Sequence, residues 1–279
     1  MSRFSVLAAA VSGTLLSTVA MSTQASVISF HVINGSPGLS VMASTDVAGA
    51  TQAGKADARA DHWNDATASG ATYTWSSTVD NAGTAQSTTA AIQTFTGGAG
   101  GDPGGANSDE LMMRSNVDFQ GRTAIYPAGN PGGRFTASSI PYATYDVYVY
   151  ISTWNSNVDR IAAASIGGTV FYGAPLPEGV VPTPTTGAGY INANSNPDGA
   201  TLADYTRGNY LYFSNVSGSD LTIDLWGADQ RLSGGAITGA DGTTRFRLSG
   251  VQIVAVPEPA SLAVLGLGSL VMLRRRRCA

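Results

Sequence analysis

The chain has 279 residues, of which 34 are glycine and 12% are charged, and its formal net charge at pH 7 is −4. Residues 26–256 contain ten lysines and arginines but eighteen aspartates and glutamates, so this central part carries a net charge of −8. A weakly charged, acidic surface excludes nucleic acid and anionic lipid as expected partners. The single cysteine is Cys278, so the central part holds neither a disulfide nor a thiolate metal site.

The first 25 residues have the pattern of a secretory signal peptide. Arg3 precedes an apolar run from Val6 to Val19, and the small residues that end at Ala25 suit a cleavage site. We therefore expect residues 1–25 to direct export through the Sec machinery and to be removed. The alternative is an N-terminal core helix.

From residue 26 onward, apolar and polar residues alternate in short runs, which is the period of β-strands. In residues 26–33, Ile28 and Phe30 lie on one face while Ser29 and His31 lie on the other, so we expect a half-buried strand. Residues 55–65 are compatible with one short helix or with a structured loop. The glycines in residues 97–105 predict a mobile loop.

The middle of the chain continues the alternation. In residues 110–120, Met113 and Val117 lie on the same face of a predicted strand, and residues 144–151 form the strongest strand. Residues 160–172 predict a hairpin that turns at Gly167-Gly168, because consecutive glycines suit a tight turn. Further strands are predicted at residues 71–76, 89–95, 134–140, 209–213, 221–226 and 245–254.

The last of these runs changes phase. Phe246 and Leu248 occupy even positions and Val251 and Ile253 odd ones, which indicates a β-bulge at Ser249-Gly250. Roughly ten short strands with no helices between them predict an all-β domain. The expected architecture of residues 26–255 is an antiparallel β-sandwich or jelly roll.

Catalytic residues are not expected in this chain. Hydrolysis would need a nucleophile with its base, or two opposed carboxylates. The chain has two histidines, His31 and His62, and we interpret His31 as a surface or hydrogen-bonded strand residue. Asp61 with His62 would fit part of a triad, but no Gly-x-Ser-x-Gly elbow accompanies the pair.

No metal site is predicted either. The four-residue spacing of Asp57, Asp61 and Asp65 would place them on one face of a helix, which we interpret as solvated rather than cation-binding. Jelly rolls are compatible with a structural calcium ion held by carboxylates and carbonyls. However, each aspartate at a turn suits that turn equally well, so no cofactor is expected.

Sugar binding combines aromatic rings, which stack on pyranose faces, with polar side chains that bind hydroxyls. The candidate glycan-binding residues are Trp63, Trp154, Asn155 and Trp226. The alternative for each of them is burial between the sheets or under loops.

The last 24 residues combine three features. Pro257-Glu258-Pro259 ends the preceding strand, because neither proline has an amide donor. Residues 260–273 are fourteen uncharged residues, and as a helix they would span about 21 Å, short of the roughly 30 Å hydrocarbon core. The cluster Arg274, Arg275, Arg276 and Arg277 follows, and arginines favour the cytoplasmic side of a membrane.

This three-part arrangement resembles the PEP-CTERM sorting signal of bacterial exported proteins. The resemblance implies that an exosortase, a membrane protease-transpeptidase, processes the tail while it lies transiently in the inner membrane. The expected final location is the cell surface or the extracellular matrix. The chain then consists of a signal peptide (1–25), a β-sandwich (26–255) and a sorting segment (256–279).

The central part is similar to the galactose-binding-like jelly rolls in segments such as His62-Trp63-Asn64 and Leu248-Ser249-Gly250-Val251. Together the two resemblances imply a non-enzymatic surface or matrix protein that associates with exopolysaccharide. The alternatives are a carbohydrate-binding module with a defined glycan ligand and a secreted hydrolase.

Overall fold

The computed structural model describes an all-β sandwich, as expected from the alternating runs. One short 3-10 turn, η1 (Leu202–Asp204), lies among the described elements. The described residues are 25–33, 53–67, 72–94, 97–101, 109, 112–113, 115–121, 132–152, 160–176, 189–195, 202–228 and 244–257.

The first sheet is organised around β16, the longest described strand, which pairs antiparallel with β1, β10 and β8. β14 extends the sheet beyond β10, while β2 lies parallel to β1 and β7 pairs with β8. The strands of this sheet are β14 (Tyr210–Ser217), β10 (Thr144–Ser152), β16 (Thr244–Ala255), β1 (Val27–Ile33), β2 (Asn64–Thr67), β8 (Ser115–Gly121) and β7 (Gly97–Gly101).

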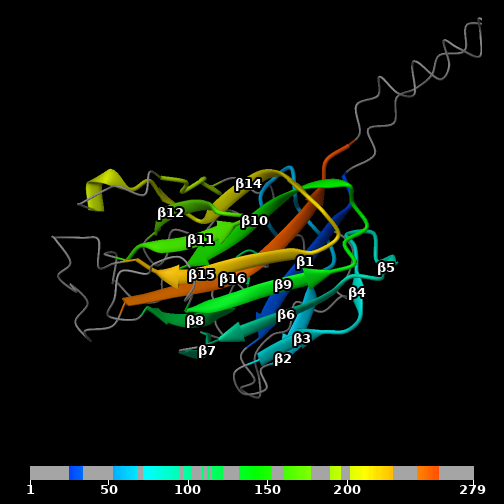
Figure 1. Ribbon diagram of the computed structural model, residues 1–279, viewed down its shortest axis with the longest axis horizontal. Coiled ribbons are helices and arrows are strands. Elements are labelled where there is room, and N and C mark those ends of the chain that lie inside the picture. The colour runs from blue at the N-terminus through cyan, green and yellow to red at the C-terminus, as the bar shows by residue number, and fades with distance from the viewer. Residues whose placement is uncertain are drawn as a thin grey trace, which may run out of the picture.

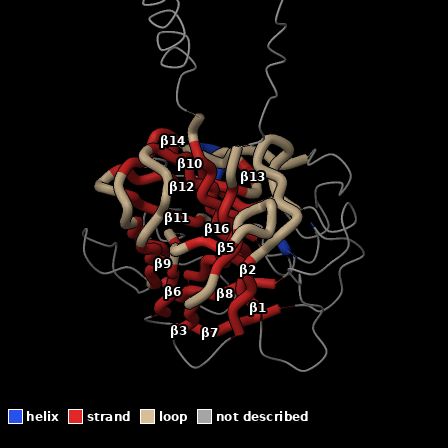
Figure 2. The backbone as a smooth tube through the Cα atoms, turned by 90° about the vertical axis from the view of Figure 1, so that its right-hand side faces the viewer, coloured by secondary structure: helices blue, strands red, loops and turns tan. Residues whose placement is uncertain are grey.

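The second sheet packs face to face with the first, and in Figure 1 its strands β15, β9 and β6 cross in front of β16 and β1. Its order is β13 (Arg207–Gly208), β12 (Thr169–Pro175), β11 (Ala162–Ile166), β15 (Leu221–Gly227), β9 (Gly133–Ser138), β6 (Thr89–Thr94) and β3 (Thr72–Trp75). A small ladder of β4 (Thr78–Val79) and β5 (Ala85–Gln86) lies at the right-hand end of the sandwich in Figure 1, which is the end that faces the viewer in Figure 2.

The main core fills the space between the sheets. Phe30 of β1 packs edge to face against Trp75 of β3, with ring centroids 5.5 Å apart, and against Phe135 of β9, at 5.3 Å. Aromatic pairs of this kind add about 0.5–1.5 kcal/mol beyond the area they bury. The Trp75 indole N–H donates to the Asn64 carbonyl at 2.8 Å, so its one polar group is satisfied inside the core.

A covering segment, residues 53–63, lies over the outer face of the first sheet. It is a structured loop, the second of the two predicted alternatives, and its alanines pack with Trp63, Met112 and Tyr150 in a second apolar cluster. Ser29 and His31 beneath it are fully buried. The prediction that β1 is half-buried is therefore wrong, because the polar face of the strand is covered by chain rather than by water.

Gln252 of β16 connects the covering segment to the sheet. Its side-chain amide donates to the Ala58 carbonyl at 2.8 Å and to Ser29 Oγ at 2.9 Å, and its oxygen accepts from the Tyr150 hydroxyl. Buried polar groups are stable only when they have partners, so this side chain fixes the loop in one position.

Asp109 holds the same segment from the other side. It is fully buried, and its carboxylate accepts from the Gly54 N–H at 3.0 Å, the Tyr190 hydroxyl at 2.7 Å and the Arg59 guanidinium at 3.1 Å. Burial raises the pKa of Asp109 above its ordinary value, although these three donors oppose the shift. Burial also raises the pKa of Tyr190 well above its usual value.

Two predicted elements differ from the structure. Within residues 97–105, Gly97–Gly101 form strand β7 rather than a loop, since strand pairing uses backbone groups that glycine also has. Residues 112 and 113 have helical backbone, and the strand begins only at Ser115. Met113 therefore packs in the second cluster while Val117 faces the main core, and the predicted shared face is wrong.

The predicted hairpin and bulge are confirmed. β11 and β12 turn at Gly167-Gly168, with φ of 56° and 88°. In the β10–β16 pairing, Tyr150 opposes Gly250 while Ile151 opposes Leu248, so Ser249 is the extra residue that the phase change predicted.

Both described ends of the chain lie at one end of the sandwich, which we call the terminal pole. Val27 opposes Val254, and the Ala255 N–H donates to the Ser26 carbonyl at 2.9 Å. The Val256 N–H donates to the Thr144 carbonyl at 3.1 Å, so the last strand is held on both edges until the residue before Pro257. Figure 1 shows the start of β1 beside the end of β16.

Candidate functional site

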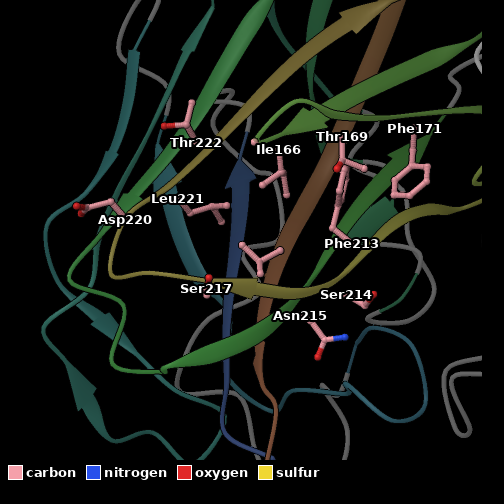
Figure 3. Close-up of a pocket in the computed structure, with 12 residues that line it drawn as sticks. Ile166, Thr169, Phe171, Phe213, Ser214, Asn215, Ser217, Asp220, Leu221 and Thr222 are labelled. Atoms are coloured by element: carbon pink, nitrogen blue, oxygen red, sulfur yellow. The ribbon is translucent and has the colours of Figure 1, made fainter.

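A cleft opens along the edge of the sandwich at the terminal pole, with a volume of about 580 Å³ (Figure 3). One wall is the β11–β12 hairpin of the second sheet, and the other is the end of β14 in the first sheet with the turn into β15. It belongs to the terminal pole because Ser217, which lines it, opposes Thr144, the residue that also binds Val256. Its lining residues are Ile166, Gly167, Thr169, Phe171, Phe213, Ser214, Asn215, Val216, Ser217, Asp220, Leu221 and Thr222.

The floor of the cleft is the rim of the main core. Phe213 and Leu221 are 4% and 2% exposed, and the half-buried Ile166, Phe171 and Val216 pack against the same core. The rings of Phe171 and Phe213 lie 4.9 Å apart at an interplanar angle of 55°. Because these side chains are fixed by strands of both sheets, the floor is an apolar surface of defined shape.

The rim of the cleft is polar and exposed. The polar residues around it are Thr169, Ser214, Asn215, Ser217, Asp220 and Thr222, all of them exposed. Pockets that recognise small molecules combine an apolar lining with a few placed polar groups, and occupy roughly 300–1,000 Å³. The cleft has the dimensions and the lining of such a site.

Asn215 is held in an unusual backbone conformation at this rim. Its φ is 55°, in the left-handed region that asparagine tolerates better than most residues. The register of β10 and β14 shifts between Tyr145 and Val147, and Asp146 is the β10 residue at this shift. One Asp146 oxygen accepts from the Asn215 N–H at 2.9 Å and the other from the Tyr212 hydroxyl at 2.7 Å. The Asn215 backbone is therefore fixed before any ligand arrives.

The two predicted glycan-binding residues that the structure describes, Trp63 and Trp226, lie in different clusters. Trp63 is 1% exposed in the second cluster, where its ring meets Tyr150 at 6.1 Å, so burial rather than stacking on a sugar describes it. Trp226 is half-buried on the outer face of the second sheet, with its ring 6.2 Å from that of Tyr172. Trp154 and Asn155 lie outside the described residues.

The structure contains an acid–base pair, His31 with Asp65, that is not proposed from the sequence. His31 Nδ1 lies 2.8 Å from Asp65 Oδ1, because β1 and β2 are parallel and these two residues are register partners. His31 is fully buried and its Nε2 has no hydrogen-bond partner.

Asp57, Asp61 and Asp65 do not share one face of a helix, because the covering segment is not a helix. Asp57 is exposed, whereas Asp65 belongs to β2 and pairs with His31. Among the described residues, no group of three or more His, Cys, Asp or Glu side chains is arranged to hold a metal ion. A structural calcium ion is compatible with the sequence but is not predicted from it.

The described chain thus defines an all-β sandwich whose last strand leads directly into the sequence tail. Residues 255–277 match the family model of the PEP-CTERM protein-sorting motif, which confirms the resemblance seen in the sequence. The chain therefore carries the sorting signal of exported proteins that an exosortase processes. This signal directs export of the protein through the membrane to the cell surface. No curated protein and no solved structure matches the chain.

The motif begins inside the last strand. Ala255 is paired in β16 and Pro257 is exposed, while Glu258, Pro259 and the four arginines lie beyond the described residues. Where the structure describes the chain, it contains no helix with the length and apolar character that crossing a membrane requires.

Proposed function

We propose that the exported sandwich is a non-enzymatic protein of the cell surface and extracellular matrix that associates with exopolysaccharide. The observation that supports this proposal is the cleft, where an apolar floor is surrounded by hydroxyl and amide groups. Sugars present apolar C–H faces and polar hydroxyls together, so this combination suits them. Export through the Sec machinery and a transient inner-membrane intermediate belong to the same proposal, and the sorting motif supports them.

Hydrolysis has less support from the geometry. Glycoside hydrolases use two carboxylates, and among the described lining residues of the cleft Asp220 is the one carboxylate. The His31–Asp65 pair has the orientation of a base and its partner. However, His31 is fully buried, and no described hydroxyl lies within hydrogen-bond reach of its Nε2.

A carbohydrate-binding module with one defined glycan ligand is the second candidate. The observation that favours it is the fixed geometry of Asn215, because a binding group that is already ordered loses little entropy when the ligand arrives. A general matrix protein would need no such feature.

The test uses residues 26–256, which include every described strand. We expect this fragment to bind at least one polysaccharide on an array that includes the matrix of the producing bacterium. We also expect no new reducing ends after prolonged incubation with the bound polymer. Failure to bind any polysaccharide would overturn the proposal, and release of reducing ends would replace it with the hydrolase.

A further inference from the structure

We propose that the cleft at the terminal pole is a binding site for uncharged hexose units of a polysaccharide, and that it discriminates against uronate-type anionic polymers. This inference rests on the proposed association with exopolysaccharide. It adds the location of the site and the chemical class of the ligand.

The charges around the cleft argue for an uncharged ligand. None of the described lining residues is a lysine or an arginine, whereas Asp220 stands exposed at the rim and Asp146 lies behind Asn215. Residues 26–256 as a whole carry a net charge of −8. An anionic sugar would find no cation to pair with and would be repelled by the field of the domain.

The lining argues for a sugar rather than for a purely apolar ligand. The exposed rim carries four hydroxyls and one amide, each of which both donates and accepts hydrogen bonds, as sugar hydroxyls do. The Phe171 and Phe213 rings beneath them offer an apolar surface to the C–H groups of a hexose. A lipid or an aliphatic ligand would leave these rim groups without partners.

The walls argue that the site is formed in advance. The Gly167-Gly168 turn supports one wall with two consecutive positive φ angles. Asp146 holds the other wall through Asn215 and Tyr212. A cleft fixed on two strand pairs keeps its shape without the ligand, which favours selection between similar sugars.

The experiment is affinity electrophoresis of residues 26–256 through gels that contain either a neutral hexose polymer, such as a glucan or a galactomannan, or alginate as the anionic polymer. We expect retardation by at least one neutral polymer and none by alginate at low ionic strength. Asn215→Gly keeps the positive φ while it removes the amide. It should weaken the retardation by about 3- to 10-fold, the value of one neutral hydrogen bond.

A pair of charge variants tests the discrimination. Asp220→Lys should create retardation by alginate, because it places a cation at the rim. Asp204→Lys changes the net charge by the same amount on the exposed η1 turn, away from the cleft, and should create little or none. Unchanged thermal unfolding of each variant will show that the sandwich is intact.

The outcomes separate the two proposals. Neutral binding that Asn215→Gly does not weaken would overturn the cleft assignment while leaving the association with polysaccharide in place. Retardation of the native protein by alginate as strong as by any neutral polymer would overturn the ligand class. Retardation by no polymer at all would remove the proposed function together with this inference.

Discussion

At the scale of single residues, the fit between Gly250 and Trp63 decides how the first sheet is covered. A Cβ atom at position 250 would lie 2.9 Å from Trp63 Cζ3 and 3.0 Å from the Phe30 carbonyl oxygen. The indole ring therefore needs a residue without a side chain directly beneath it. The bulge at Ser249 brings Gly250 to this position.

Replacing Gly250 with alanine should reduce the free energy of unfolding by about 1–3 kcal/mol, because the added methyl overpacks a site bounded by backbone and an aromatic ring. Denaturant titration measures the loss. The double variant Gly250→Ala/Trp63→Phe should recover part of the effect, since the smaller ring gives way to the methyl. An unchanged midpoint in the single variant would contradict this explanation.

The residues of the cleft were not identified from the sequence, although one signal was present. The alternation of β14 breaks at Ser214-Asn215, and breaks of this kind mark bulges, which are frequent near binding sites. Trp63 is a candidate for glycan binding from the sequence because aromatic rings stack on pyranose faces, and burial is its stated alternative. Its actual partner, Gly250, is almost two hundred residues away, and no local pattern reveals such a contact.

At the scale of elements, the β11–β12 hairpin shows where local sequence is sufficient. Gly167 and Gly168 both have positive φ, as a two-residue turn that follows the strand twist requires. A Cβ at either position would meet nothing within 4 Å, so any effect of substitution comes from the backbone alone.

Gly167→Asn should therefore change the free energy of unfolding by less than about 0.5 kcal/mol, because Asn-Gly is a preferred sequence for this turn. Gly167→Val should cost about 1–2 kcal/mol, since a β-branched residue is strained in the left-handed region. Thermal unfolding of the two variants gives the comparison. Equal stability of the two would show that the turn conformation differs from the one described.

The strands were predictable where side chains alternate and not where they are absent or covered. β1, β10, β15 and β16 follow the apolar period of their sequences, whereas β11 and β12 are predicted from the glycine turn between them. β7 consists of glycine and alanine and has no period to detect, because backbone pairing with β8 alone defines it. The polar face of β1 predicts contact with solvent, but its two polar side chains bind protein groups instead: Ser29 accepts from Gln252, and His31 pairs with Asp65.

At the scale of the whole molecule, two parts of the sequence have separate tasks. The sandwich between Val27 and Ala255 has its own core, whereas residues 255–277 carry the sorting motif. The two overlap by one residue, Ala255, which is paired on both edges of β16. The sorting motif therefore starts directly at the surface of the folded sandwich, with no linker between the two.

Deleting Arg274 to Arg277, or replacing Pro257, Glu258 and Pro259 with alanine, should leave the protein unprocessed and change its final location. The physical reason is that each change removes one of the three parts of the motif without altering a described strand. Immunoblotting of cell fractions for a size shift measures the effect. Arg245→Lys, which leaves the motif intact, is the matched control. Normal processing of both tail variants would rule out the assigned role of these residues.

The pairing of β10 with both β14 and β16 has a consequence for what the cleft can reach. Ser217 lies two strand spacings from Val256, or about 10 Å. Residues 257–259 add at most about 10 Å before the uncharged run that is predicted to enter the membrane. While the tail is attached, we therefore expect the mouth of the cleft to lie close to the bilayer, where a long polymer has little room. We expect removal of the tail to free the sandwich to rotate, so that processing changes which molecules the cleft can meet as well as where the protein is located.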